Sequence, residues 1–432
     1  MKTKIINSIK GNNAVIGIIG LGYVGLPLAI NFAKAGFRVI GFDKNQSTLT
    51  SINKAQSPIS HISNEAISQV KTKIKATKRY EHIKECNAII ICLPTPLDSH
   101  RQPDLSYIID SIKEMSSFLQ KGQLISLEST TYPGTTKEVL MPAIEKLGFT
   151  IGKDFFLVYS PEREDPGNKN FELASIPKIC GGVTSNCLDI GYLLYSQVIS
   201  RVIPVSSPEV AELTKLLENI HRSINIGLVN EMKVIADSMG IDIFEVIRGA
   251  ATKPFGFVPY WPGPGLGGHC IPIDPFYLSW KAKEFGLNAR FIELAGEVNI
   301  QMHDWVVNKI IVSLNKIQQT VKNSKILILG TAYKKNVSDV RESPSITIID
   351  RLLSMGAKLK YHDPYVKEIN NLSNKKSLKS LKNLNKNVLS QFDVVVLLTD
   401  HDAFDYATIL KHSNYIVDTR GRYKVSKKVS RA

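Results

Sequence analysis

Residues 14–33 read AVIGIIGLGYVGLPLAINFA, and this uncharged stretch decides how the chain begins to fold. Its length would suit a membrane span, but its four glycines and one proline argue against a continuous apolar helix. The pattern instead predicts a buried strand over 14–19, a tight turn, and a helix over 25–35 that ends at Gly36. No other segment is long and apolar enough to cross a bilayer, so we expect a soluble cytoplasmic protein.

The turn within this stretch, residues 20–25, has the spacing G-x-G-x-x-G. Such turns are common, but this one follows a predicted strand, opens a helix, and is followed by Asp43 at the end of the next strand, 38–42. The glycines let a pyrophosphate approach the helix N-terminus, and Asp43 can accept hydrogen bonds from the adenosine ribose. That carboxylate would repel a 2′-phosphate, which favours NAD over NADP, although Lys44 weakens the argument. The expected cofactor-binding residues here are Gly20, Gly22, Tyr23, Val24, Gly25 and Asp43.

Working outward, strand-like runs at 88–93, 124–128 and 155–159 alternate with helical patterns, which predicts a parallel, doubly wound sheet. Apolar residues at helical spacing then predict one long helix over 208–240, about 45 Å in length, that connects domains and forms a dimer. A second α/β pattern starts at Lys325, without a convincing sequence repeat of the first. We therefore predict two Rossmann-like doubly wound domains, 1–205 and 320–432, joined by a long central helix and a small helical middle domain, 206–315.

The composition restricts the possible partners and compartment. Lys and Arg number 54 against 39 Asp and Glu, a net charge of +15, which fits a nucleic-acid surface, a site for polyanionic small ligands, or scattered solvated lysines. The charges are spread out and no nucleic-acid-binding motif is present, so we favour the last and expect no nucleic-acid or membrane partner. Five cysteines without a C-x-x-C pair argue against disulfides or a zinc site, and for a reducing compartment.

One cysteine stands apart from the rest. Cys270 lies in GPGLGGHCIPID (263–274), where the glycines suggest close approach of the backbone to a ligand, and where His269 and Asp274 are near enough to influence a thiol. Taken alone, the loop fits a small buried cysteine in a tight turn equally well. Beside an NAD fold, however, a reactive thiol suggests oxidation of an aldehyde through a thiohemiacetal and a thioester.

The order of these motifs resembles the UDP-glucose/GDP-mannose dehydrogenase family over nearly the whole chain. The motifs are GLGYVGLP (20–27), PTP (94–96), ESTTYPGTT (128–136), SPEREDPG (160–167), ELTKLLEN (212–219), GPGLGGHCIPID (263–274) and GTAYKKNVSDVRESPS (330–345). The resemblance implies that two NAD are reduced for each UDP-sugar, whose C6 alcohol becomes a carboxylate. It also implies a homodimer or higher homo-oligomer and a role in bacterial surface-polysaccharide synthesis.

The resemblance assigns roles that the residues alone do not. Cys270 would attack the C6 aldehyde, Lys215 would stabilise the C6 oxyanion, and Asn219 would share its helix face, four residues on. Asp274 would act as a base or orient Lys215, Glu162 would activate water, and Thr131 would position water or the nicotinamide. The implied cofactor contacts add Thr95, Thr131 and Arg341. The implied substrate contacts are Glu162, Lys215, Asn219, Phe257, Tyr260, Gly267 and Lys334.

Several of these residues have simpler interpretations. Without the family, Lys215 would be a solvated lysine on a helix, Thr131 part of a turn, and Phe257 and Tyr260 ordinary core aromatics.

One departure bears on the substrate. UDP-glucose-type relatives carry a second glutamate four residues after the position of Glu162, and here that position is Pro166, which leaves the roles of Glu164 and Asp165 open. SPER followed by PG is similar to the branch that acts on UDP-N-acetylhexosamines, so we expect UDP-N-acetylglucosamine. UDP-GalNAc, UDP-ManNAc and UDP-glucose are the alternatives within the same chemistry. A two-electron hydroxyacid dehydrogenase and a non-catalytic NAD-binding protein are the alternatives outside it.

Overall fold

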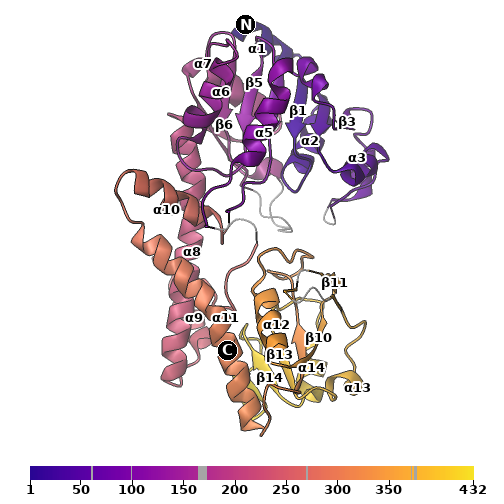
Figure 1. Ribbon diagram of the computed structural model, residues 1–432, viewed down its shortest axis with the longest axis vertical. Helices are drawn as coiled ribbons and strands as arrows, with labels where there is room; N and C mark the ends of the chain where they lie inside the picture. The colour runs from indigo at the N-terminus through magenta and orange to yellow at the C-terminus, as the bar shows by residue number, and fades with distance from the viewer. Residues whose placement is uncertain (60–61, 99, 164–172, 269–270, 371, 374–376) are drawn as a thin grey trace. The chain divides into compact units, whose positions relative to one another are not determined.

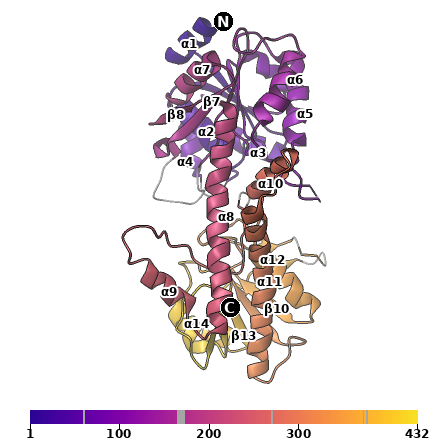
Figure 2. The same ribbon diagram turned by 90° about the vertical axis from the view of Figure 1, so that its left-hand side faces the viewer.

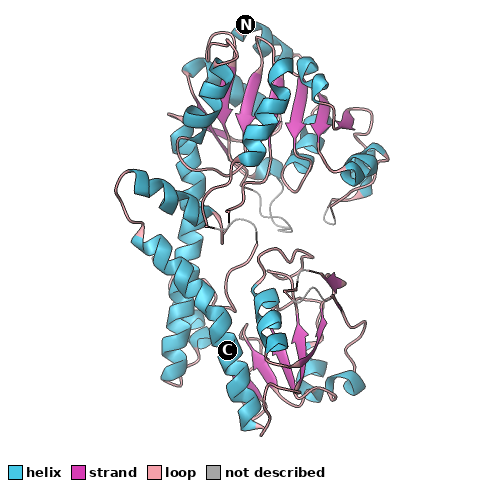
Figure 3. Ribbon diagram, in the orientation of Figure 1, coloured by secondary structure: helices cyan, strands magenta, loops and turns pink. Residues whose placement is uncertain are grey.

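The computed structural model describes residues 1–432 except 60–61, 99, 164–172, 269–270, 371 and 374–376. It divides into two compact units. The first comprises Met1–Glu218 and Phe276–Leu287, and the second Asn219–Pro275 and Asn288–Ala432. Each unit contains a sheet flanked by helices, as Figure 3 shows, so the predicted α/β class is confirmed. The proposed division into three domains stays a prediction.

The sheet of the first unit has the strand order β3-β2-β1-β4-β5-β6-β7-β8 among the described residues (Figure 1). The strands are β1 (Val15–Ile19), β2 (Arg38–Phe42), β3 (Ile74–Thr77), β4 (Ala88–Ile91), β5 (Leu124–Leu127), β6 (Phe156–Tyr159), β7 (Lys178–Gly182) and β8 (Val202–Val205). The helices are α1 (Lys2–Lys10), α2 (Gly25–Lys34), α3 (Gln46–Asn53), α4 (Asn64–Ser68), α5 (Ser106–Met115), α6 (Met141–Glu145) and α7 (Ser185–Tyr195).

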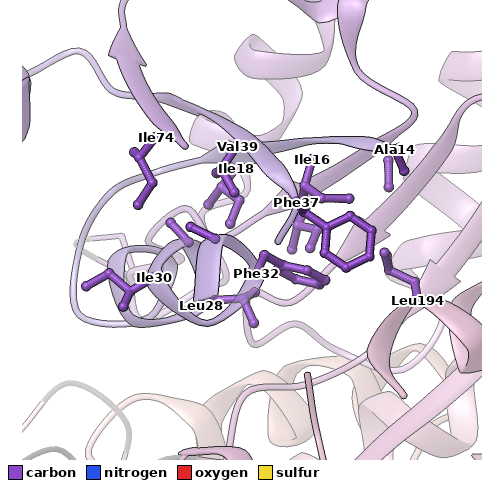
Figure 4. Close-up of a cluster of buried hydrophobic side chains, with 14 of the residues drawn as sticks. Ala14, Ile16, Ile18, Leu28, Ile30, Phe32, Phe37, Val39, Ile74 and Leu194 are labelled. Atoms are coloured by element: carbon purple, nitrogen blue, oxygen red, sulfur yellow. The ribbon is translucent and has the colours of Figure 1, made fainter. Parts of the chain in front are cut away.

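The apolar stretch at 14–33 forms the centre of this unit. β1 is buried on both faces and pairs with β2 and β4, so every residue from Ile16 to Ile19 is apolar or glycine. On α2, Leu28 and Phe32 point into the core, and Phe32 meets Phe37 edge to face at 5.8 Å between ring centroids (Figure 4). Each such fully buried side chain stabilises the fold by roughly 1.5–3 kcal/mol.

One pairing differs from the predicted parallel sheet. β6 and β7 are antiparallel, with Tyr159 opposite Gly181, whereas the other neighbouring strands of this sheet run parallel. An antiparallel neighbour requires no crossover helix, so no alternation of strand and helix announces it in the sequence. The edge strands β3 and β8 were also not predicted, because an edge strand tolerates polar residues and even a proline, here Pro204.

Four helices lie between the two α/β patterns in the chain: α8 (Pro208–Ser238), α9 (Ile243–Ala250), α10 (Asp274–Glu284) and α11 (Arg290–Lys316). The predicted long helix is confirmed as α8, which Figure 2 shows as one uninterrupted helix. Within the second unit α11 packs closely on it, since a Cβ on Gly227 would lie 3.3 Å from Ala295. No helix in the described part of the chain is long and apolar enough to cross a membrane.

The sheet of the second unit has the order β10-β9-β13-β14-β15 in the described residues, and all its pairs are parallel. Its strands are β9 (Lys325–Leu329), β10 (Lys358–His362), β13 (Val394–Leu397), β14 (Ile416–Asp418) and β15 (Val429–Arg431). β11 (Glu368–Ile369) and β12 (Leu378–Lys379) pair antiparallel as a separate two-stranded sheet. The helices are α12 (Pro344–Ser354), α13 (Lys386–Leu389) and α14 (Tyr406–His412).

Candidate active site

The glycine-rich turn between β1 and α2 is shaped by close backbone contacts. Gly20 has φ +92°, and a Cβ there would lie 2.6 Å from the carbonyl oxygen of Cys92. A Cβ on Gly25 would lie 1.9 Å from the carbonyl oxygen of Gly20, so neither position accepts a side chain. Around Gly22, by contrast, nothing lies within 4 Å of an added Cβ among the described atoms. Two of the glycines thus build the turn, and the middle one keeps its outer surface open for a ligand.

Asp43 lies directly after β2 and reaches back to this turn. Its Oδ2 accepts a hydrogen bond from the backbone N–H of Leu21 at 2.9 Å, and its Oδ1 accepts one from Asn45 at 2.8 Å. The side chain is only partly buried, and a carboxylate oxygen has a second lone pair. Lys44 points to Glu114, with 2.8 Å between Nζ and Oε1, so its charge is matched by that glutamate.

Thr95 and Thr131 lie at the carboxyl ends of neighbouring strands, β4 and β5. Thr95 is buried, and its hydroxyl donates to the carbonyl of Thr130 at 2.7 Å. Thr131 is fully buried, yet its hydroxyl has no hydrogen-bond partner among the described residues. A buried hydroxyl without a partner costs about 1–3 kcal/mol, so this one points to a group that arrives with a ligand.

Glu162 belongs to a buried charge cluster in the first unit. Its Oε2 lies 3.2 Å from Nζ of Lys178, which also lies 3.0 Å from Oε2 of Glu128. The hydroxyl of Tyr195 donates to the other oxygen of Glu128 at 2.6 Å. Burial alone would lower the pKa of Lys178, but the two carboxylates outweigh it and raise that pKa. Lys178 therefore carries its charge.

Lys215 is 8% exposed on α8, so it is not the solvated lysine that its sequence context alone suggests. One turn earlier, Glu212 accepts hydrogen bonds from the backbone N–H groups of Gly134 and Thr136, at 2.6 and 2.9 Å. Burial raises the pKa of Glu212 to about 7, although these hydrogen bonds oppose the rise. The helix that carries Lys215 is thereby tied to the loop that carries Thr131.

In the second unit the structure brings Asn219 and Asp274 together. Both are buried, and Nδ2 of Asn219 donates to Oδ2 of Asp274 at 2.5 Å across 55 positions of sequence. Asn219 lies on α8 and Asp274 opens α10, at the end of the glycine-rich loop. This hydrogen bond fixes the last residue of the loop to the helix that also bears Lys215.

The start of the same loop is fixed from α8 as well. Asn230 accepts from the N–H of Gly263 at 3.0 Å, and the Lys233 ammonium donates to the carbonyl of Gly263 at 3.0 Å. Burial, with Arg420 nearby, lowers the pKa of Lys233 to about 7. Further along, Gly267 fits only because it lacks a side chain, since a Cβ would lie 2.7 Å from Cβ of Tyr333. The expected nucleophile Cys270 and its neighbour His269 lie outside the described residues.

The remaining expected ligand residues lie in the second unit. The Lys334 ammonium stands 5.8 Å from the ring centroid of Tyr333, and Arg341 binds Asp339 through two nitrogens, Nε at 3.0 Å and Nη2 at 2.6 Å. Phe257 is 37% exposed, and the hydroxyl of Tyr260 lies 3.1 Å from Nδ1 of His221. Phe257 is therefore not an ordinary core aromatic.

Several residues of these clusters had no signal in the sequence. Lys178 donates a hydrogen bond to Glu162, and Tyr195 donates one to Glu128. Lys233 donates to the carbonyl of Gly263. The only hint was Glu128 itself, which ends a predicted strand, 124–128, and opens the motif that contains Thr131. Lys178 opens a strand that pairs antiparallel, so no motif could connect it with Glu162.

Three family models match the chain in order. The models describe the NAD binding domain, the central domain and the UDP binding domain of the UDP-glucose/GDP-mannose dehydrogenase family, and they match residues 14–199, 209–301 and 327–425. The chain belongs to this family. It is accordingly an NAD-dependent oxidoreductase of the UDP-sugar dehydrogenase family, as the sequence resemblance implied.

Individual relatives of the chain differ in substrate. UDP-N-acetyl-D-glucosamine 6-dehydrogenases of Pseudomonas aeruginosa and Salmonella typhi are 35% and 37% identical to it over 353 residues, 81% of this chain and 83% and 82% of theirs. The solved structure of a UDP-D-ManNAc dehydrogenase from Pyrococcus horikoshii superposes with a TM-score of 0.86 at 31% identity, over 96% of this chain and 98% of that one. The family is thus established, and its members are named for more than one UDP-sugar.

The residues of the first unit fit the NAD cofactor of this family. Gly22 has open space where a pyrophosphate would approach, and within the described residues no side chain caps the N-terminus of α2. Asp43 offers a partly exposed carboxylate, and Thr131 holds a buried hydroxyl without a partner among the described residues. The turn would hold the pyrophosphate and Asp43 the ribose, while Thr131 would meet the cofactor or a water.

Proposed function

We propose that this chain oxidises the C6 alcohol of UDP-N-acetylglucosamine to the uronic acid, with two NAD consumed per sugar. The observation that carries the choice of sugar is the 35% and 37% identity to two enzymes named for that substrate, over four-fifths of the chain. Pro166, where UDP-glucose-type relatives have a glutamate, supports an N-acetylhexosamine rather than glucose.

The proposed roles follow the chemistry of each residue. NAD, when bound, accepts a hydride from C6 in each of the two oxidations. Cys270 forms the covalent bond to C6 at the aldehyde stage, giving a thiohemiacetal and then a thioester. Lys215 stabilises the oxyanion on C6, and the Asn219–Asp274 hydrogen bond supports Asp274 as the group that takes a proton or orients Lys215. Glu162 activates the water that releases the acid.

The proposal extends to the remaining ligand contacts. Gly20, Gly22, Tyr23, Val24 and Gly25, with Asp43 and Thr95, would bind NAD, and Arg341 would meet the same cofactor. Phe257, Tyr260 and Gly267 would line the pocket for the nucleotide sugar, and Lys334 would meet its phosphates. The open space at Gly22 and the close packing at Gly267 support the two glycine assignments.

A homodimer formed across α8 is part of the proposal. In the second unit, Leu228, Met232 and Ile235 recur at helical spacing and are 53%, 40% and 47% exposed. Met239 and Ile241 continue the same exposed run at 67% and 44%. An apolar stripe of this kind is typical of a protein–protein interface. Sedimentation of the protein would test it, and a monomer at micromolar concentration would contradict it.

A second candidate substrate is UDP-N-acetylmannosamine, favoured by the structural similarity to the Pyrococcus horikoshii enzyme. The test is NADH release from the purified protein with UDP-GlcNAc, UDP-ManNAc, UDP-GalNAc and UDP-glucose, each limiting. Two NADH per UDP-GlcNAc, with the other sugars slow, would support the proposal. Two NADH from another sugar would correct the substrate, and one NADH or none would refute the covalent mechanism. Cys270→Ser should bind the nucleotide sugar and form no acid.

A further inference from the structure

We propose that Lys178 is a positioning residue for the hydrolytic half of the reaction: its ammonium holds the Glu162 carboxylate in place. The inference rests on the proposed function, in which Glu162 activates the water that cleaves the thioester. Lys178 lies outside the motifs that carry the family resemblance, whereas its second partner Glu128 opens the motif ESTTYPGTT (128–136).

The strand order explains how Lys178 reaches Glu162. β7 runs antiparallel to β6, with Val158 opposite Gly182 and Tyr159 opposite Gly181. Continuing this register by three residues sets Glu162 opposite Lys178, the first residue of β7. β7, which with β8 runs opposite to the other six strands of the sheet, thus begins at the edge where those strands end. That is the edge where α/β sheets bind their ligands.

The ammonium of Lys178 has a full set of acceptors. Its three protons face Oε2 of Glu128 at 3.0 Å, Oε2 of Glu162 at 3.2 Å, and the carbonyl oxygen of Pro161 at 3.4 Å. The side chain is 4% exposed, so little water competes for these hydrogen bonds. Two of the three acceptors belong to the adjacent residues Pro161 and Glu162. The third belongs to Glu128, which directly follows β5.

The neighbouring residue adds to the same arrangement. Arg163 donates from Nη1 to the carbonyl oxygen of Pro177 at 2.8 Å and from Nε to Glu218 at 3.2 Å. Its backbone N–H donates to Oε1 of Glu162 at 2.6 Å. Both oxygens of Glu162 therefore have a fixed donor, one from each side, and the carboxylate plane is defined.

The Lys178 ammonium lies between two carboxylates that differ in burial. Burial raises the pKa of Glu128, with Glu162 adding to the rise and Lys178 opposing it. The Glu128 side chain is 0% exposed and that of Glu162 is 10% exposed, so Glu162 is the more accessible carboxylate of the two. The titratable groups that face Lys178 are Glu128, Glu162, Tyr195, Cys92 and Cys180.

The step served by this arrangement is the hydrolysis of the thioester on Cys270. The oxygen of water bonds to C6, and Glu162 takes one proton from that water. The C6–sulfur bond breaks, and Cys270 leaves as a thiolate with the bonding electron pair. Neither oxidation step needs Glu162 in this role, so loss of Lys178 should separate the two halves of the reaction.

The experiment is rapid mixing of Lys178→Met with NAD and the UDP-sugar that the wild type oxidises, followed by acid quenching and intact-protein mass measurement. We expect a burst of two NADH per active site, a steady-state kcat lower by roughly 10²-fold, and an acyl adduct on Cys270. Lys178→Arg, which keeps the charge and the donors, should recover most of the steady-state rate. A slow variant without burst or adduct would overturn the inference.

Two further variants separate this role from simple loss of stability. Glu128→Gln combined with Lys178→Met removes one buried carboxylate together with the cation, so it should fold and bind NAD while still accumulating the adduct. Lys281→Met is the matched control, because Lys281 is also buried and bridges two glutamates, Glu138 and Glu284, at 2.7 Å each. Adduct in the control, or wild-type hydrolysis in the double variant, would overturn the inference. Absence of NADH from the wild type would instead refute the proposed function.

Discussion

The two sheets of this protein begin with the same turn, built from different sequences. Gly20 follows β1 and Gly330 follows β9, with φ values of +92° and +79°. The N–H of Gly20 donates to the carbonyl of Phe42 at 2.8 Å, and that of Gly330 donates to the carbonyl of His362 at 3.0 Å. In both turns an added Cβ would strike a backbone carbonyl, that of Cys92 at 2.6 Å or Thr399 at 2.3 Å. Each glycine is required by its own sheet.

The acid after the second strand also recurs, but in a different environment. Asp43 follows β2 and accepts from the N–H of Leu21, while Asp363 follows β10 and accepts from the N–H of Thr331 at 2.7 Å. Asp43 stays partly exposed. Asp363 is 3% exposed and also accepts from His401 Nε2 at 3.0 Å. The same position thus carries a partly exposed carboxylate in one unit and a buried one in the other.

The segments between turn and helix differ too. α2 begins five residues after Gly20, whereas α12 begins fourteen residues after Gly330, at Pro344. That longer loop carries Lys334, and it is tied to His401, whose Nδ1 accepts from the N–H of Asn336 at 2.9 Å. The two turns therefore differ in the length of the segment that precedes the helix as well as in the burial of the carboxylate after the second strand.

Among the substitutions that test this comparison, Asp363→Ala should lower the free energy of unfolding most. It would leave the N–H groups of Thr331 and Ala332 and the ring of His401 without their acceptor in a buried place, which costs roughly 3–5 kcal/mol of unfolding free energy. Urea unfolding, with hydrogen exchange of β9 and β10 as the local measure, would check it.

The matched control is Asp43→Ala. The partly exposed Asp43 should contribute no more than about 1 kcal/mol to stability, while its loss raises the KM for NAD about tenfold or more, because charged hydrogen bonds to the ribose disappear. Equal destabilisation by the two substitutions would break the distinction between a ligand-binding and a structural acid.

The second prediction concerns the loss of stability at acidic pH. Burial alone would raise the pKa of Asp363, but hydrogen bonds from His401 and from the backbone outweigh it and lower that pKa to about 2. A carboxyl with a lowered pKa in the folded state stabilises the fold above its unfolded pKa of about 4, and this contribution is lost as pH falls toward 2. The second unit should therefore lose about 2 kcal/mol between pH 4 and pH 2. Asp363→Asn should show a flat response of β9 exchange in this window, and a parallel fall in both proteins would contradict the assignment.

The smallest expected effect on folding belongs to Gly22→Ala. Nothing in the described structure lies within 4 Å of the added Cβ, so the unfolding free energy should change by less than about 1 kcal/mol. NAD binding should weaken all the same, because the new methyl group occupies the space that a pyrophosphate would approach. Calorimetric titration with NAD and thermal unfolding would measure the two effects. Gly330→Ala should show the reverse pattern, with lost stability and unchanged NAD binding.

Several features of this protein are determined by local sequence alone. The strand, turn and helix of 14–33 were predictable, because the apolar period, the glycines of the turn and Asp43 act over about thirty residues. The long helix α8 was predictable from the spacing of its apolar residues. The motifs at 128–136 and 263–274 indicated where chemistry is concentrated, and the roles of Cys270, Lys215 and Glu162 remain proposals.

Only the tertiary structure decided which groups meet across long stretches of chain. Lys178 meets Glu128 across 50 positions because β7 turns against the direction of its neighbour, and no local pattern encodes that reversal. Asp363 meets His401 across 38 positions because β10 and β13 both border β9. Side-chain burial and strand order are properties of the whole sheet, so they set the charge state of a lysine or a carboxylate in ways that its sequence neighbours cannot.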